Sequence, residues 1–95
     1  FRYKGTTPCI VDFYANWCGP CRQIQPMMER MAKKYQGKLI IYKLNVDNAR
    51  EICDRFGIQS IPTLMFFNRT TAPTRMVGAP TESELDAAIN DFLNK

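Results

Sequence analysis

Two cysteines at the junction of a predicted strand and a predicted helix constrain this chain more than any other feature. The run Cys9–Ala15 is apolar except for Asp12, as is typical of a strand covered on both faces. Cys18 and Cys21 follow it, three positions apart, so they can meet across one helical turn and join as a disulfide. At a helix N-terminus, free backbone N–H groups and the helix dipole favour thiolate, the reactive form of cysteine. The sequence therefore predicts a redox-active dithiol at this junction.

Length and composition limit the chain to a single domain, expected to span residues 1–95. Apolar residues make up 45% of it, which suffices for an ordinary compact core, and no apolar stretch approaches the ~20 residues of a membrane span. The net charge is +4, but the basic residues are scattered and no nucleic-acid motif accompanies them, so we expect no nucleic-acid partner. Histidine is absent, which excludes Cys-His and Ser-His-Asp catalysis and histidine metal ligation.

The rest of the sequence predicts alternating strands and helices. After the dithiol, apolar residues recur at helical spacing, with Pro26 placed to kink the helix and Gly37 placed to end it. Leu39–Val46 predicts a second buried strand, which completes a parallel, right-handed βαβ unit. The remaining segments are a short helix over 49–56 closed by Gly57, strands Leu64–Phe67 and Thr74–Gly78 in an antiparallel hairpin, and a last helix opened by a capping box at Thr81–Glu84. This order predicts a mixed four-stranded sheet with helices on both faces.

The chain resembles the thioredoxin family along almost its whole length. The matching elements occur in family order: Val11-Asp12-Phe13, Trp17-Cys18-Gly19-Pro20-Cys21, Pro26, Tyr35–Leu39, Lys43–Asp47, Gly57-Ile58, Ile61-Pro62-Thr63 and Val77-Gly78-Ala79. The resemblance implies an α/β, thioredoxin-like three-layer sandwich, in which helices flank the mixed four-stranded sheet. There are two departures from the family, because Phe1–Thr7 is too short to supply the strand and helix that usually come first, and Thr70 replaces a common glycine. We therefore expect the first strand of the family to be missing.

The resemblance also implies an activity, namely the reduction of protein disulfides by thiol–disulfide exchange, within electron transport and cell redox homeostasis. Cys18, at the helix N-terminus and nearer solvent, is implied to be the attacking thiolate. Cys21, one turn in and more buried, is implied to be the resolving thiol that breaks the mixed disulfide. The implied partners are disulfide-containing proteins and a disulfide reductase that supplies electrons. No cofactor is expected.

Asp12 is a carboxylate inside an apolar strand, where an unpaired charge is costly. One interpretation is a surface residue on an edge strand. In similar proteins, however, such a buried acid lies behind the second cysteine and exchanges protons with it, and burial would raise its pKa and make it a usable base. Lys43, on the neighbouring strand, is the expected partner of Asp12, and the alternative is a lysine that simply extends into solvent.

The resemblance assigns substrate binding to residues around the dithiol: Trp17, Gly19, Pro20, Ile61, Pro62 and Gly78. Gly19 would let the backbone of another chain come close, and Pro20 would stiffen the turn. Pro62 is implied to be a cis-proline that turns the backbone of Ile61 towards the substrate and keeps metals from the dithiol, although trans is the commoner form of an X–Pro bond. Trp17 would be a flat flank beside the site, and a core aromatic is the alternative interpretation.

Other functions remain open at this point. The four cysteines at 9, 18, 21 and 53 could bind zinc or an iron–sulfur cluster, but only one pair has ligand spacing, so we expect no metal. The chain could instead be an exported oxidase or isomerase of the same fold, although Gly19 and Pro20 resemble the reducing members. It could also be a non-enzymatic interaction subunit that keeps the fold as a docking platform.

The sequence also indicates where the protein works, how it assembles and what state its other two cysteines are in. We expect a cytoplasmic protein, or a periplasmic or secreted one if a signal was removed before Phe1. Without the first strand of the family, Leu39–Leu44 should be a sheet edge whose free backbone groups favour a dimer or aggregation, unless Phe1–Thr7 covers that edge. Cys9 and Cys53 lie in apolar sequence surroundings, so we expect both to stay protonated, unreactive and unbonded to each other.

Overall fold

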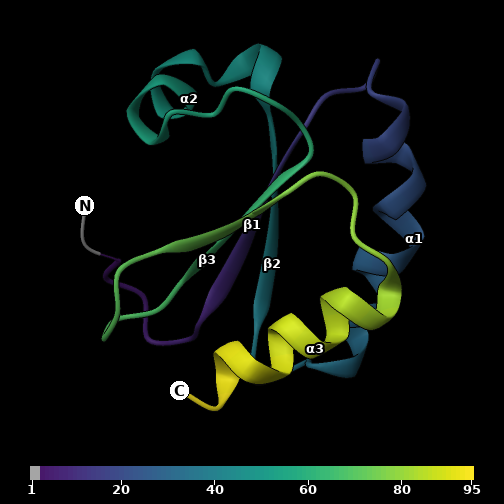
Figure 1. Ribbon diagram of the computed structural model, residues 1–95. Helices are drawn as coiled ribbons and strands as arrows, with labels where there is room; N and C mark the ends of the chain where they lie inside the picture. Colours follow the sequence, from purple (N-terminus) through teal and green to yellow (C-terminus); the bar gives the residue numbers. More distant parts are fainter. Residues whose placement is uncertain (1–2) are drawn as a thin grey trace.

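The structure, a computed structural model, describes residues 3–95. Its helices and strands follow the predicted order (Figure 1). In chain order they are β1 (Cys9–Tyr14), α1 (Gly19–Lys34), β2 (Ile40–Asn45), the 3₁₀ turn η1 (Val46–Asn48), α2 (Arg50–Phe56), β3 (Thr63–Phe67), β4 (Thr74–Val77) and α3 (Glu82–Leu93). The predicted elements are all present close to their expected bounds, and η1 is an addition to them.

The four strands form a mixed sheet in the order β2-β1-β3-β4. β1 runs parallel to β2 and antiparallel to β3, and β3 forms an antiparallel hairpin with β4. In this register Asp12 of β1 lies beside Lys43 of β2 on one side and Leu64 of β3 on the other. The predicted sheet is therefore confirmed, and the strand that leads to the dithiol lies in its interior rather than at its edge.

Helices cover both faces of this sheet, as predicted for a three-layer sandwich (Figure 1). On one face Ile10 belongs to a buried cluster with residues of α1 and α3. On the other face Phe13 belongs to a cluster with Cys53 of α2. Because successive residues of a strand point to opposite faces, Asp12 and Tyr14 share the face of Ile10. β1 therefore places its carboxylate on the side of the sheet covered by the helix that carries Cys21.

Local sequence explains where the helices begin and end. The predicted capping box of α3 is present, because Thr81 Oγ1 accepts the backbone N–H of Glu84 at 3.1 Å and Glu84 Oε1 accepts the backbone N–H of Thr81 at 2.8 Å. α2 ends at Gly57, whose φ of +63° lies in the left-handed region that glycine adopts at low cost. α1 continues through Pro26 and ends just before the predicted stop at Gly37.

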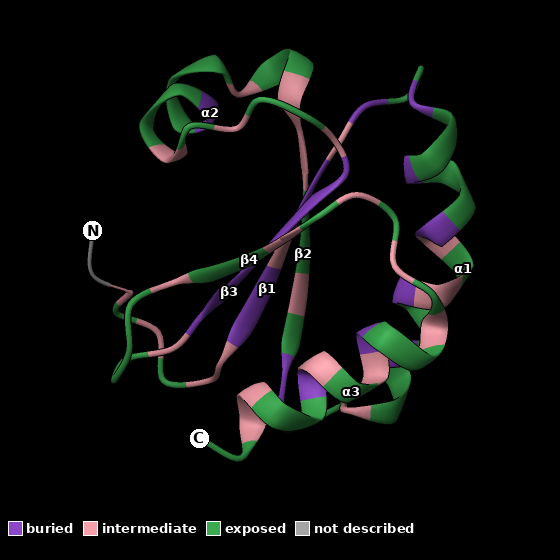
Figure 2. Cartoon of the chain, viewed as in Figure 1, coloured by how far each residue is buried: buried purple, intermediate pink, exposed green. Residues whose placement is uncertain are grey.

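The prediction that β2 is buried is wrong, because β2 is an exposed edge strand. Ile40 and Tyr42 are 41% and 51% exposed. Figure 2 shows β2 with mostly exposed and intermediate residues, whereas β3 is buried along its length. Within the described residues only β1 pairs with β2, and residues 3–8 form neither strand nor helix. The predicted sheet edge is thus confirmed within residues 3–95, while Phe1 and Arg2 lie outside the described part.

Candidate active site

The two cysteines of the predicted dithiol lie at the junction between β1 and α1, joined as a disulfide. The backbone N–H of Cys18 donates to the carbonyl of Ala15 at 3.2 Å, which closes the turn after the strand. Cys18 is the N-cap of α1, and its Sγ accepts the backbone N–H of Cys21 at 3.2 Å. The two Cα atoms are 5.3 Å apart, well inside the separation that a disulfide can bridge. The predicted pairing across one helical turn is therefore confirmed.

Both cysteines are buried, and Cys18 is only slightly the more exposed of the two. Its exposed fraction is 5%, against 2% for Cys21, so the predicted order of exposure is present but small. The pair forms a small cluster with Ala15, against which Tyr14 and Ile61 pack. A reacting disulfide must therefore approach Cys18 closely and from one side. The apolar cluster shields the opposite side of the pair from water.

The helix end favours a thiolate at Cys18 after reduction. The N–H of Cys21 that reaches Cys18 Sγ is among the orphan donors of the first helical turn, and a charged sulfur is a better acceptor for it than a thiol. The first turn of α1 contains no acidic residue that would offset the positive end of the helix dipole. The helix end and the hydrogen bond are thus in place at Cys18, and a thiolate there stays a prediction.

A second segment of the chain faces the disulfide, and the bond between Ile61 and Pro62 in it is cis, as predicted. The carbonyl oxygen of Ile61 lies 3.9 Å from Cys18 Sγ, close enough to accept a hydrogen bond from a thiol there. Gly78 donates its backbone N–H to the carbonyl of Pro62 at 2.9 Å, with a φ of +93° that glycine tolerates. Three segments distant in sequence therefore meet beside the dithiol.

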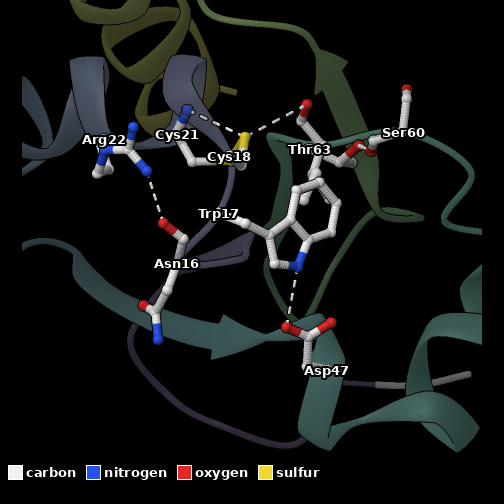
Figure 3. The surroundings of a disulfide bond; sticks show 9 residues. Asn16, Trp17, Cys18, Cys21, Arg22, Asp47, Ser60 and Thr63 are labelled. Carbon is white, nitrogen blue, oxygen red and sulfur yellow. Dashed lines mark hydrogen bonds between the residues drawn. A yellow bond between two sulfur atoms is a disulfide. The ribbon is translucent and has the colours of Figure 1, made fainter.

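Trp17 lies at the surface beside the disulfide, so the alternative of a core aromatic is wrong. It is 68% exposed, and its indole Nε1–H donates to Asp47 Oδ2 at 3.0 Å (Figure 3). A groove of about 310 Å³ opens next to it. Its walls come from Trp17, η1, α2 and the loop before Pro62, with Asp47, Arg50 and Ile61 among the lining residues. Such a groove can hold the chain that carries a reacting disulfide.

Asp47 and Arg50 are site residues that sequence reasoning did not single out. Asp47 belongs to one of the segments that carry the resemblance, and its carboxylate fixes the orientation of the Trp17 ring. Arg50 begins α2 and lines the same groove. No local motif marks either residue, because only the packing of η1 and α2 beside the β1–α1 turn brings them to the site.

Asp12 is buried in the centre of the sheet, so the alternative of a surface residue on an edge strand is wrong. It is 1% exposed, and neither carboxylate oxygen accepts a hydrogen bond from the described part of the chain. Burial raises the pKa of Asp12 from 3.8 to about 6, while the positive charge of Lys43 lowers it in part. Lys43 forms no ion pair with Asp12 within residues 3–95, and its Nζ instead lies over the ring of Tyr14, 4.5 Å from the centroid.

The two remaining cysteines are free thiols in the apolar layer beneath α2. Cys9 of β1 and Cys53 of α2 are both buried and belong to the same apolar cluster, but they are not bonded to each other. Burial raises the pKa of both thiols. Within residues 3–95, no three histidine, cysteine, aspartate or glutamate side chains are arranged to hold a metal ion. The same part of the chain has no helix with the length and apolar character needed to cross a membrane.

Two cysteines that alternate between a disulfide and a thiolate–thiol pair exchange bonds with other disulfides. The fold and the site therefore define a thiol–disulfide oxidoreductase. Residues 3–91 match the family described as Thioredoxin. The chain belongs to the thioredoxin family, whose members are protein-disulfide reductases that act by thiol–disulfide exchange.

Individual relatives extend this match over nearly the whole chain. A thioredoxin of Borreliella burgdorferi is 39% identical over 92 residues, which are 97% of this chain and 79% of the relative. A thioredoxin of Pseudomonas aeruginosa is 40% identical over 87 residues, or 92% of this chain and 81% of the relative. A chloroplastic M-type thioredoxin of Spinacia oleracea is 40% identical over 94 residues, and the matched region is 52% of its length.

Proposed function

We propose that this protein, as a single domain, reduces disulfides in other proteins, with Cys18 as the attacking thiolate and Cys21 as the resolving thiol. Cys18 Sγ attacks one sulfur of the substrate disulfide, that bond breaks, and the leaving sulfur takes up a proton as a thiol. The Cys21 thiol then loses its proton and attacks Cys18 Sγ, which releases the second substrate sulfur. Two electrons have passed to the substrate, and Cys18 and Cys21 are left as a disulfide.

The hydrogen bond from the Cys21 backbone N–H to Cys18 Sγ is the observation that carries this assignment of roles. It stabilises negative charge on Cys18, the sulfur at the helix end, and not on Cys21. Cys18 is also the sulfur nearest to the carbonyl of Ile61 in the facing loop. The attacking role therefore falls to Cys18, and the more deeply buried Cys21 is left to resolve the mixed disulfide.

Asp12 is proposed as the proton acceptor for Cys21. Its burial and a pKa of about 6 support this role, because a base is most effective when its pKa is near the working pH. It lies on the face of the sheet that α1 covers, and within the described chain neither of its oxygens is committed to another group. Lys43, its neighbour across the strand pair, is proposed to adjust the charge of the site.

Substrate binding is proposed for the surface around the disulfide. The residues are those of the turn, the cis-proline loop and the end of β4: Trp17, Gly19, Pro20, Ile61, Pro62 and Gly78. Trp17 supplies a flat apolar wall, and Gly19 leaves space because nothing lies near the position a Cβ would take. A substrate segment in extended conformation fits the groove between Trp17 and Ile61.

The wider context of the protein is also a proposal. Electrons would come from a disulfide reductase, and the proposed working compartment is the cytoplasm, with the periplasm or an extracellular space as the alternative if a signal was removed before Phe1. The exposed edge of β2 is proposed to join two copies of the chain, because its outer backbone groups have no strand partner within residues 3–95.

Reduction of insulin disulfides tests the proposed function. Cys18→Ser should lower the rate to that of the uncatalysed reaction, while Cys21→Ser should accumulate a mixed disulfide with the substrate. Cys9→Ala is the matched control, because Cys9 is a free thiol outside both the pair and the groove and should leave the rate close to that of the parent protein. Full activity of Cys18→Ser would leave the proposal without support, and would favour a non-enzymatic docking role.

A further inference from the structure

Tyr14 occupies a position that connects three parts of the site. It is the last residue of β1 and points to the same face as Asp12, two positions earlier. Its side chain packs against the cluster that contains Cys18 and Cys21. The ammonium of Lys43 lies over its ring, 4.5 Å from the centroid. No motif of the sequence assigns this tyrosine a role.

The strand register explains how the contact between Tyr14 and Lys43 forms. Lys43 pairs directly with Asp12, and Tyr14 pairs with Asn45, so the lysine and the tyrosine are diagonal neighbours on one face. The two side chains are long enough to meet across the strand pair, as the 4.5 Å from Lys43 Nζ to the ring centroid shows. A cation centred over an aromatic face is attracted by the electrons of the ring. The ammonium is therefore held beside the sheet, although the exposed edge strand would let it extend into water.

The position of this ammonium matters because few charges act on Asp12. Lys43 of β2 and Leu64 of β3 pair with Asp12 across the sheet, and Tyr14 of β1 points to the same face. The helix α1, which covers this face, carries Cys21. β3, β4 and α3 contribute apolar residues to the buried cluster on that face. Lys43 is the charged group that lowers the pKa of the carboxyl, against the effect of burial. A lysine that moved into water would interact with the carboxylate less, because the solvent would screen its charge.

We propose that Tyr14 is a positioning residue, whose ring holds the ammonium of Lys43 at the sheet and so fixes the positive charge beside Asp12. This inference rests on the proposed role of Asp12 where it concerns the redox cycle. The contact itself is a property of the folded protein and is independent of that role. An aliphatic residue at position 14 would fill similar space but would release Lys43.

Carbon-13 NMR titration of the Asp12 carboxyl group tests the proposal. The oxidised protein is used, because Cys21 does not titrate in the disulfide and the curve then reports Asp12 alone. Tyr14→Leu should raise the apparent pKa of Asp12 by up to about 0.7 pH units, because the free energy of a surface cation–π contact limits the shift that its loss can cause. Tyr14→Phe keeps an aromatic face and should leave the value within about 0.2 units of the parent protein.

The same substitution in a protein that lacks Lys43 separates the loss of the cation–π contact from general effects on packing. In a Lys43→Met protein the ammonium is absent, so Tyr14→Leu should cause no further shift in the titration of Asp12. An equal shift in the presence and absence of Lys43 would overturn the proposal, since the ring would then act through burial alone. No shift in the Lys43-containing protein would also overturn it. Amide spectra of each variant show whether the fold is retained.

The pH profile of Cys21 alkylation, measured on a Cys18→Ser protein, distinguishes this inference from the proposed function. If Asp12 accepts the proton of Cys21, Tyr14→Leu should displace that profile in the same direction as the carboxyl titration. If the profile does not respond to Asp12→Ala either, the proposed role of Asp12 fails. The coupling between Tyr14 and Lys43 would still be decided by the titration of the oxidised protein.

Discussion

Replacing Asp12 with alanine should stabilise the folded protein near neutral pH and slow its redox cycle. The side chain is 1% exposed, and its oxygens accept no hydrogen bond from residues 3–95. Burial raises its pKa from 3.8 to about 6, even with the opposing effect of Lys43. An acid whose pKa is higher in the folded than in the unfolded protein destabilises the fold once it ionises. Asp12 therefore reduces the stability of the fold once it ionises, and under its proposed role this would be a cost of function.

The magnitude and the pH range follow from this pKa shift. Each pKa unit corresponds to about 1.4 kcal/mol, so a shift from 3.8 to about 6 makes the ionised carboxylate cost about 3 kcal/mol. Below the pKa of Asp12 in the unfolded chain, the carboxyl group is protonated in both states and does not lower the free energy of unfolding. As pH rises, the unfolded chain ionises first, so stability is lost between about pH 4 and pH 6. Above the pKa of Asp12 in the folded protein, the loss of stability no longer changes with pH.

Urea unfolding of the oxidised protein at several pH values measures this effect. The free energy of unfolding of Asp12→Ala minus that of the parent protein should rise by about 2–3 kcal/mol between about pH 3.5 and pH 8. The small cavity left by the substitution adds an offset that does not depend on pH. Asp12→Asn is the control, because it keeps the volume and should show the same pH dependence with a different offset. A difference that is flat, or that falls with rising pH, would refute the reasoning.

Three further predictions concern the spare thiols, the last helix and the sheet edge. In the reduced native protein, an alkylating reagent at neutral pH should modify Cys18 first. Cys9 and Cys53 should react only on unfolding, because burial raises the pKa of these two thiols. Rapid labelling of Cys53, which lines the groove, would contradict this prediction. Thr81→Ala should lower the free energy of unfolding by about 1 kcal/mol, because it removes the cap of α3, and an unchanged urea midpoint would count against the cap. Sedimentation should show a dimer that Tyr42→Lys disrupts, whereas a monomer at high concentration would exclude association through β2.

The parts of the structure that sequence could predict depend on neighbours along the chain. The pairing of Cys18 with Cys21 follows from helical spacing, and the cap at Thr81 follows from a four-residue pattern. The order of strands and helices follows from apolar periodicity. The cis bond before Pro62 is different, because local preference favours trans and only the family resemblance indicated it.

The parts that sequence could not predict depend on what lies across the fold. An apolar run such as Leu39–Val46 is compatible with a buried strand, and only its place at the end of the sheet makes β2 exposed. The contact of Asp47 with Trp17 spans segments that no local pattern connects. Lys43 was predicted as a partner of Asp12, and the register confirms their proximity. The same register also brings Lys43 next to the ring of Tyr14, and this contact could not be predicted from the apolar periodicity of the sequence.

Because side chains alternate along β1, this short strand contributes residues to two different layers of the protein. Ile10, Asp12 and Tyr14 face the helix that carries the dithiol, whereas Cys9 and Phe13 belong to the apolar layer beneath α2. Under the proposed role of Asp12, substitutions on the dithiol side would therefore affect proton transfer without replacing a residue of the layer under α2. In evolution or in engineering, the layer under α2 can therefore be changed without replacing any residue on the side of β1 that faces the dithiol. A strand of six residues is enough to separate the two sides.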